Sequence, residues 1–329
     1  MSQPSHRPGR LGVGVISAGR VGAVLGAALR GAGHAVVGVH ASSEASRDRA
    51  AALLPDVPVL DVQSIVERSE LVLLAVPDDQ LPGLVSGLAA TGAWQPGQLV
   101  VHTAGRYGTD VLEPVRAAGS IGLAVHPAMT FTGLSLDLQR LADCSFAVTA
   151  AAPVLPIAQA LVVEMGAEPV VVAEADRPLY HAALAHGSNH VMTVLGESMQ
   201  LLGEIGVEHP DRVLGPLVRA TVDNALASGE NALTGPVARG DVTTVAAHVA
   251  ALRELAGGGA RAGHDAAGPV GSADHDAAGP TGNADHDAAR QLLAGYRALA
   301  RQTARRAAVS GRLDETSYRA VMAAIEEEQ

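Results

Sequence analysis

The sequence predicts an α/β fold in which a doubly wound domain is followed by an all-α domain. Three observations support this fold class. Short apolar runs alternate with helical patterns from Leu11 to Val172, which is typical of a parallel sheet covered by helices. A glycine-containing turn directly follows the first apolar run. From Arg177 onward, long helical patterns replace the strands almost completely.

The first three elements predict a nucleotide-binding unit. Leu11–Ile16 is an apolar run suited to a buried strand, a helix continues to about Gly31, and Ala35–His40 predicts the second strand. The turn between strand and helix consists of Ser17, Ala18, Gly19, Arg20, Val21 and Gly22. Gly19 lets the backbone approach a pyrophosphate and Gly22 lets the helix pack on the strand, although Ser17 replaces the first glycine of the G-x-G-x-x-G pattern. The context predicts a Rossmann domain whose helix N-terminus receives the phosphates.

The end of the second strand indicates which dinucleotide binds. An acidic residue there would hold the ribose 2′-hydroxyl of NAD, but the sequence continues with Ser42, Ser43 and Arg47. Two hydroxyls and a cation suit a 2′-phosphate, so NADP(H) is favoured over NAD(H). Glu44 opposes this interpretation. In the alternative interpretation, these residues only cap a helix and form its solvated face.

The alternation of strands and helices continues to about Ala173, where we expect the sheet to end. The expected strands are 57–60, 71–76, 99–102, 121–125, 145–148 and 169–172. The expected helices are 44–54, 80–90, 110–118 and 157–165. The carboxyl ends of the strands form the edge at which such sheets bind ligands.

Three of these strands end in residues that we expect around a nicotinamide. They are Val76, Pro77, Asp78, Thr103, His126 and Thr130. His126 is the candidate proton donor among them because histidine titrates near neutral pH. The hydroxyl of Thr130 is a candidate substrate ligand. In the alternative interpretation, His126 is only a turn residue before Pro127.

A second polar cluster begins the long helical pattern after Pro178. At 100° per residue, His181, Ser188 and Asn189 fall on one side of a helix, with the small Ala185 between them. This stripe leaves room for a ligand, so the three residues are candidates for catalysis. The alternative is that His181 caps the helix or packs between the domains.

Composition excludes several classes of function. All 23 basic residues are arginine, and the missing lysine excludes Walker-type phosphate binding, Schiff-base chemistry and the Tyr-Lys pair of short-chain dehydrogenases. The net charge of −11 argues against a nucleic-acid partner. A single cysteine, Cys144, excludes an internal disulfide and a cysteine-based zinc cluster, and we expect no metal site. No apolar run is long enough to span a membrane, so a cytoplasmic location is expected.

The predicted domain organisation has four parts. Residues 1–10 form a flexible tail, 11–174 the Rossmann domain and 175–329 the helical domain, with helices at 178–202, 211–228, 242–255, 289–310 and 314–327. The segment His264–Asp274 is repeated as His275–Asp285, and it lacks large apolar residues. We therefore expect a disordered insertion at about 256–288, with a metal site on its His-Asp pairs as the weaker alternative.

Several motifs occur in an order that resembles a known family. They are S-A-G-R-V-G, A-V-P-D-D, H-T-A-G, H-P-A-M-T-F-T-G, R-P-x-Y-H-A-A and G-S-N. The order is similar to the Rossmann-like oxidoreductases whose C-terminal half is domain of unknown function 2520. More remotely, the layout resembles pyrroline-5-carboxylate reductase, ketopantoate reductase and the β-hydroxyacid dehydrogenases. The resemblance implies a helical domain of the 6-phosphogluconate-dehydrogenase C-terminal type and a homodimer formed through that domain.

The resemblance to ketopantoate reductases also bears on catalysis. In that family a catalytic lysine precedes an asparagine by two helical turns, and aligning the asparagine with Asn189 places His181 at the lysine position. A later segment, Leu233–Asp241, is also family-like, and Arg239 in it is a candidate ligand for a substrate carboxylate. A surface salt bridge is the alternative for Arg239.

These observations lead to one leading hypothesis and two alternatives. The leading hypothesis is an NADP-dependent reductase acting on a C=O or C=N group of a small carboxylate, with His181 as proton donor, Ser188 and Asn189 orienting the acceptor, and His126 as reserve acid. One alternative is an NADP-binding sensor without turnover. The other is hydride exchange with a deazaflavin, for which the sequence offers few aromatic residues.

Overall fold

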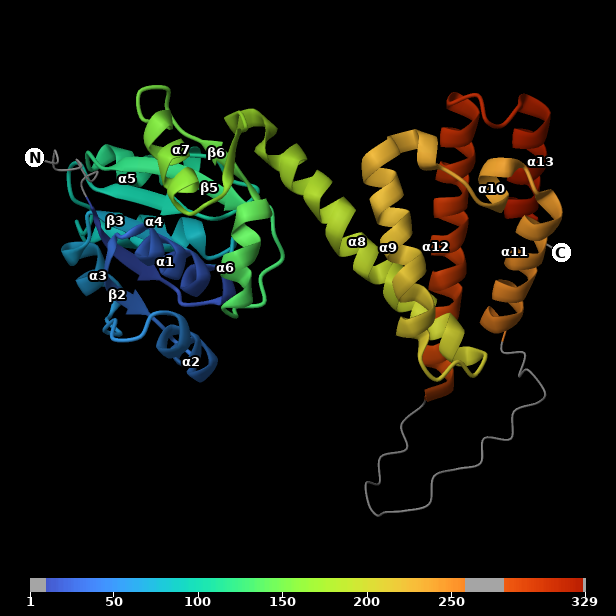
Figure 1. Cartoon of the computed structure of the whole chain (residues 1–329), viewed down its shortest axis with the longest axis horizontal. Helices are drawn as coiled ribbons and strands as arrows, with labels where there is room; N and C mark the ends of the chain where they lie inside the picture. Colours follow the sequence, from blue (N-terminus) through green and yellow to red (C-terminus); the bar gives the residue numbers. More distant parts are fainter. Residues whose placement is uncertain (1–9, 258–280, 328–329) are drawn as a thin grey trace, which may run out of the picture. The chain divides into compact units, whose positions relative to one another are not determined.

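The computed structural model describes residues 10–257 and 281–327 of the chain (Figure 1). The chain divides into two compact units between Val191 and Met192. This division lies within a long helix, whereas the sequence places the domain boundary where the sheet ends. The predicted N-terminal tail and most of the predicted insertion lie outside the described residues.

The first unit contains a seven-stranded sheet with the strand order β2-β1-β3-β4-β5-β6-β7. The strands are β1 (Gly12–Ile16), β2 (Ala35–His40), β3 (Leu71–Leu74), β4 (Leu99–His102), β5 (Ile121–Pro127), β6 (Ser145–Thr149) and β7 (Glu168–Val171). Neighbouring strands are parallel except for the antiparallel pair β5 and β6. The strand order reverses at β1, with β2 on one side and β3 on the other, and this creates the crevice in which doubly wound sheets bind ligands. The predicted fold class is confirmed.

Helices cover both faces of this sheet. They are α1 (Arg20–Ala32), α2 (Glu44–Leu53), α3 (Val62–Arg68), α4 (Leu81–Ala90), α5 (Glu113–Ala117), α6 (Leu136–Arg140) and α7 (Leu155–Glu164), with short 3-10 turns η1 (Asp110–Leu112), η2 (Leu141–Asp143) and η3 (Glu174–Asp176). Successive residues of a strand point to opposite faces, so Leu73 packs with α1 and α7 while Leu74 packs with α3 and α4. The central strands β1, β3, β4 and β5 are therefore buried on both sides, whereas the edge strand β7 is largely exposed.

The prediction of a strand at 57–60 is wrong. This segment forms only an isolated bridge between Val39 and Val59. Pro58 has no N–H group to donate to a ladder, and Asp61 ends the segment by capping α3 through the Ser64 N–H group. The helices α3 and α6 are not predicted, and β5 extends through His126, which therefore lies inside a strand rather than after it.

The helix α8 (Arg177–Glu204) begins in the first unit and continues into the second. The second unit also contains α9 (Pro210–Ser228), η4 (Gly229–Ala232), α10 (Pro236–Arg239), α11 (Val242–Ala256), α12 (Thr281–Val309) and α13 (Glu315–Glu326). Its core is formed by apolar residues of α10 to α13, among them Val245, Ala304 and Val321. Residues 281–288, which the sequence assigns to the insertion, are helical, so α12 begins earlier than predicted.

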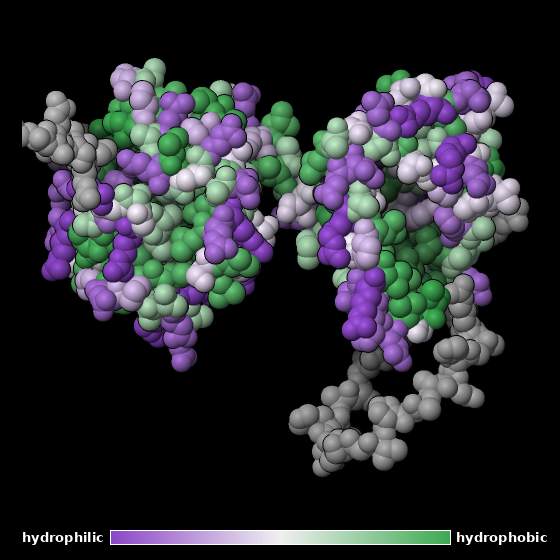
Figure 2. All heavy atoms as spheres, in the orientation of Figure 1, coloured by the Kyte–Doolittle hydropathy of each residue, from purple (hydrophilic) through white to green (hydrophobic). Residues whose placement is uncertain are grey.

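The helix α9 packs poorly within the chain. None of its 19 residues is buried. Its apolar side chains are exposed, among them Leu217 at 63% and Leu226 at 83%. Figure 2 shows apolar side chains at the surface of both units. The described residues therefore leave an apolar surface on α9 uncovered.

Candidate functional site

The glycine turn between β1 and α1 has the geometry that a dinucleotide requires. Ser17, at the first glycine position, has a positive φ of 78°, which L-residues other than glycine rarely adopt. A Cβ on Gly19 would have only the Ser17 hydroxyl within 4 Å, so the backbone there is open to a ligand. A Cβ on Gly22 would lie 2.0 Å from the Ser17 carbonyl oxygen, so only glycine allows α1 to pack this closely. The residues of the turn therefore fit a pyrophosphate.

A cleft of about 850 Å³, here called the turn cleft, opens at this turn. Its lining includes the predicted residues Ser17, Gly19, Arg20, Val21, Val76, Pro77, Asp78 and Thr103. Ala18 and Gly22 do not line it: Ala18 is fully buried and its N–H group donates to the His40 carbonyl oxygen at 2.8 Å. The structure thus brings the ends of β1, β3 and β4 together around one cleft.

The residues after β2 divide into two kinds. The Ser43 hydroxyl accepts the Ser46 N–H group at 3.2 Å in a capping box, so it is engaged in starting α2. Ser42 and Arg47 are exposed, and Arg47 has no ion pair within the described parts of the chain. Their assignment to the cofactor stays a prediction.

Arg49 is a candidate cofactor residue that the sequence analysis missed. Its Nη1 donates to the Ala18 carbonyl oxygen at 3.3 Å, beside the glycine turn. A Cβ on Gly133 would lie 2.9 Å from Arg49 Cδ and 3.2 Å from Arg20 Cγ, so both arginine stems pass the same glycine. The sequence alone gives no sign of this role, because Arg49 reaches the glycine turn only through the way the chain folds.

A second cavity of about 190 Å³, here called the helix cavity, lies between β5 and α8 within the first unit. Five of the predicted site residues line it: His126, Thr130, His181, Ser188 and Asn189. His126 and His181 also line the turn cleft. The two histidines therefore stand where the two cavities meet.

The ring of His126 contacts two residues of α8. Its Nδ1 lies 2.9 Å from the Tyr180 hydroxyl, and its ring centre is 6.0 Å from that of His181. Burial, reinforced by the positive charge of Arg177, lowers the pKa of His126 to about 4. His126 is therefore a neutral imidazole near neutral pH, and it can donate a hydrogen bond but does not act as an imidazolium acid.

Gly105 makes room for both histidines. A Cβ at this position would lie 2.5 Å from His181 Cδ2 and 2.9 Å from His126 Nε2. The loop that carries Gly105 is held by the buried His102, whose Nε2 lies 2.7 Å from the Gly108 carbonyl oxygen and whose Nδ1 accepts the Ala104 N–H group at 3.2 Å. These partners require a neutral ring with its proton on Nε2, and burial lowers the pKa of His102 to about 4, which favours that form.

Arg239, the candidate carboxylate ligand, lies in the second unit. It is exposed, and its Nη1 donates to the Thr234 hydroxyl at 3.3 Å. Its contact with a substrate stays a prediction. In the first unit, Arg106 lines the turn cleft and makes a long ion pair, 3.8 Å, with Asp78.

Within residues 10–257 and 281–327, no group of three or more His, Cys, Asp or Glu side chains is arranged to hold a metal ion. No helix in the same part of the chain combines the length and apolar character needed to cross a membrane.

Comparison with protein families agrees with this architecture. The sheet, the glycine turn and the following helices define a Rossmann-type dinucleotide-binding architecture with a helical C-terminal region. Residues 1–127 match the Rossmann-like domain and residues 144–261 match domain of unknown function 2520. The chain thus combines these two domains, which confirms the resemblance described above. A comparison with curated protein sequences finds no significant match.

Solved structures share the fold at low sequence identity. A proposed NADP oxidoreductase from Bacteroides fragilis has a TM-score of 0.63 and 21% identity, covering 74% of this chain and 92% of that chain. Pyrroline carboxylate reductase from Plasmodium falciparum, solved with NADP bound, has a TM-score of 0.50 and 12% identity over 69% and 86% of the two chains. An imine reductase from Pseudomonas sp. has a TM-score of 0.51 and 17% identity over 74% and 85%.

Proposed function

We propose that the protein is an NADP-dependent reductase that acts on a C=O or C=N group of a small carboxylate. The observation that carries this proposal is the meeting of the turn cleft and the helix cavity at His126 and His181. A nicotinamide dinucleotide supplies a hydride when it is bound. The names of the structural relatives, an NADP oxidoreductase, a pyrroline carboxylate reductase and an imine reductase, support this class of reaction.

The residues of the chain bind the acceptor and supply a proton. The helix cavity, at about 190 Å³, suits a small acceptor. Ser188 and Asn189 offer a hydroxyl and an amide that orient the reacting group, and Thr130 offers a second hydroxyl. One of the two histidines donates the proton, and the sequence hypothesis assigns this role to His181.

Unpaired arginines support NADP rather than NAD as the cofactor. Arg20, Arg47 and Arg49 lie around the glycine turn and the start of α2, and within the described residues none of them has an ion pair. A guanidinium group binds a charged phosphate more strongly than a neutral ribose hydroxyl. Ser42, exposed after β2, adds a hydroxyl donor.

The experiment that tests the proposal follows NADPH absorbance and fluorescence with ketopantoate, a pyrroline carboxylate and a set of 2-keto and 3-keto acids, with NADH in parallel. Oxidation with one acceptor supports a reductase and identifies its substrate class. NADPH that binds without oxidation in every mixture contradicts the reductase and favours a sensor. His181→Ala with an unchanged rate removes His181 as the proton donor.

We also propose that a second copy of the chain covers α9, giving a homodimer. The helix has no buried residue and exposes Val213, Leu217 and Leu226. Symmetric pairs are the commonest solution for such a surface. The expected mass in solution is twice that of one chain.

A further inference from the structure

The hydrogen bond between His126 and Tyr180 bears on which ring nitrogen of His126 carries the proton. Within the described residues, the Tyr180 hydroxyl has no hydrogen-bond partner other than His126 Nδ1. The phenol can donate its proton, in which case Nδ1 accepts it. The single ring proton of neutral His126 then resides on Nε2, the atom that faces Gly105 in the wall of the turn cleft.

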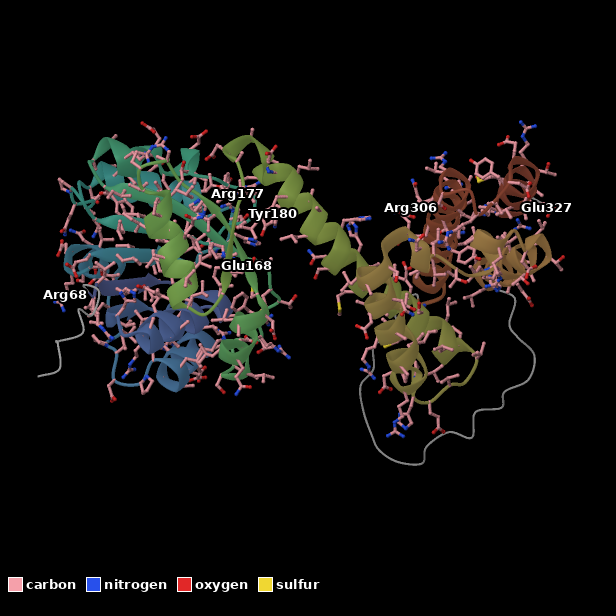
Figure 3. All side chains as sticks on the ribbon, turned by 45° about the horizontal axis from the view of Figure 1, so that its top comes forward. Arg68, Glu168, Arg177, Tyr180, Arg306 and Glu327 are labelled. Atoms are coloured by element: carbon pink, nitrogen blue, oxygen red, sulfur yellow. The ribbon has the colours of Figure 1, made fainter. Side chains whose placement is uncertain are left out.

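A buried cation lies beside Tyr180. Arg177 is fully buried, and its Cζ is 5.9 Å from the centre of the Tyr180 ring (Figure 3). It donates from Nε to the Thr149 hydroxyl at 2.7 Å and from Nη2 to the carbonyl oxygens of Ala124 and Ala147 at 3.1 Å. All three acceptors are neutral, Nη1 has no partner, and no ion pair joins Arg177 to a carboxylate among the described residues. The Glu174 carboxylate acts on Arg177 without forming an ion pair with it. A buried cation that lacks an ion pair favours negative charge on a neighbouring group.

We propose that Tyr180 and His126 form a proton relay that protonates the reduced acceptor, with Arg177 stabilising the charge left on Tyr180. This inference rests on the proposed reductase function. It assigns chemistry to the R-P-x-Y segment at the start of α8, which the proposed function alone leaves without a role.

The relay balances atoms and charge. When the acceptor carbon has received the hydride, the His126 Nε2–H bond breaks and an O–H or N–H bond forms on the acceptor. At the same time the Tyr180 O–H bond breaks and an N–H bond forms at His126 Nδ1. The tyrosinate lies beside Arg177 until the relay is reset. In the reset, one proton from solvent forms the N–H bond at His126 Nε2, the Nδ1–H bond breaks, and that proton returns to the Tyr180 oxygen. His126 remains neutral before and after the step.

The surroundings of His126 suit a neutral relay. The charged and titratable groups that act on it are Arg177, Tyr180 and His181 on α8 and His102 on β4, and none of them is a carboxylate. Burial raises the pKa of Tyr180 while Arg177 acts in the opposite direction, so the hydroxyl is protonated in the resting protein. His181 has no hydrogen-bond partner within the described residues that could return a proton to it, whereas His126 has Tyr180.

The first test measures the tautomer of His126 by ¹⁵N NMR on histidine-labelled protein without cofactor, with the signal assigned from His126→Gln. The proposal expects the proton on Nε2 in the wild type and a mixture of tautomers in Tyr180→Phe. The matched control is Tyr296→Phe, because Tyr296 contacts His248 Nδ1 at the same 2.9 Å in the second unit. A wild-type proton on Nδ1 overturns the relay.

The second test is single-turnover reduction with bound NADPH in H₂O and D₂O mixtures. Tyr180→Phe is expected to lower the rate by roughly 10²-fold, while Tyr296→Phe leaves it unchanged. The rate of the wild type should vary with the deuterium fraction along a curve, because two protons move in the same step. The rate of Tyr180→Phe should vary linearly, because only one proton moves. An active wild type with an equally active Tyr180→Phe overturns the relay alone. A wild type that reduces no acceptor overturns the proposed function, and the relay falls with it.

Discussion

The carbonyl oxygen of Ser17 lies so close to Gly22 that a Cβ at position 22 would stand 2.0 Å from it. The same Cβ would stand 2.9 Å from Ala75 Cβ, at the end of β3. One glycine thus fixes how closely α1 approaches the sheet, and this approach places the N-terminus of α1 at the turn cleft.

Gly22→Ala should therefore destabilise the protein and weaken NADPH binding. Backbone cannot give way as a flexible side chain does, so we expect a loss of about 1–3 kcal/mol in the free energy of unfolding, measured with urea. The control is Gly31→Ala in the same helix, where a Cβ would meet nothing within 4 Å and alanine favours helix. Equal stability of the two variants would contradict the prediction.

Gly105→Ala should reduce turnover more than stability. Its Cβ would displace His181, 2.5 Å away, and His126, 2.9 Å away, from the junction of the two cavities. Misplacing catalytic groups by about 1 Å costs roughly 10²-fold in rate, which steady-state kinetics can measure. Gly83→Ala, on α4 with open space at the Cβ position, is the control. Normal kinetics in Gly105→Ala would show that neither histidine acts on the substrate.

The stability of the protein should fall as the pH drops from about 6.5 to about 4, in part through His102. The pKa of His102 is about 4 in the folded protein and near the ordinary value of 6.5 when unfolded, so in this interval the unfolded chain binds more protons. The free energy of unfolding should decrease by about 3 kcal/mol over the whole interval from this residue. Urea titrations at several pH values check this: His102→Gln should lose that part of the pH dependence, whereas His209→Gln, at an exposed site, should keep it.

Local patterns in the sequence indicate most of the residues that line the helix cavity, because each pattern depends on a single element. The strand-end rule identifies His126 and Thr130, and helical periodicity identifies His181, Ser188 and Asn189, and the structure brings these residues to one cavity. The contact between His126 and Tyr180 joins residues 54 positions apart, and no local pattern reports on such a distance.

The same limit explains the errors in the fold. The apolar residues around Pro58 resemble a strand in sequence. A strand, however, must form a ladder of hydrogen bonds with a neighbouring strand, and Pro58 has no N–H group to donate. Arg49 was missed for a related reason, since its contact with the Ala18 carbonyl oxygen depends on how α2 packs beside α1.

Arg49→Gln should weaken NADPH binding about tenfold and leave NADH binding nearly unchanged. The guanidinium lies beside the glycine turn and has no ion pair within the described residues, so a 2′-phosphate gains a charge-assisted contact that a hydroxyl does not. Fluorescence titrations at low and high salt measure the two dissociation constants. Arg30→Gln, at the other end of α1, is the control, because Arg30 bonds to the Pro55 carbonyl oxygen. If the affinities for NADPH and NADH fell equally, Arg49 would have a structural role and would not select the cofactor.

The exposed apolar side chains of α9 predict how the dimer can be broken. Leu226 is 83% exposed in the single chain, so a carboxylate there costs little in the monomer but would be buried without a partner in a dimer. Leu226→Glu should therefore shift the mass measured by light scattering from two chains to one without lowering the helix content. Val163→Glu, on α7 in the first unit and 60% exposed, adds the same charge on a different helix and should remain dimeric. A wild type that has the mass of one chain at every concentration would remove the dimer, and the exposed face of α9 would then require a different partner.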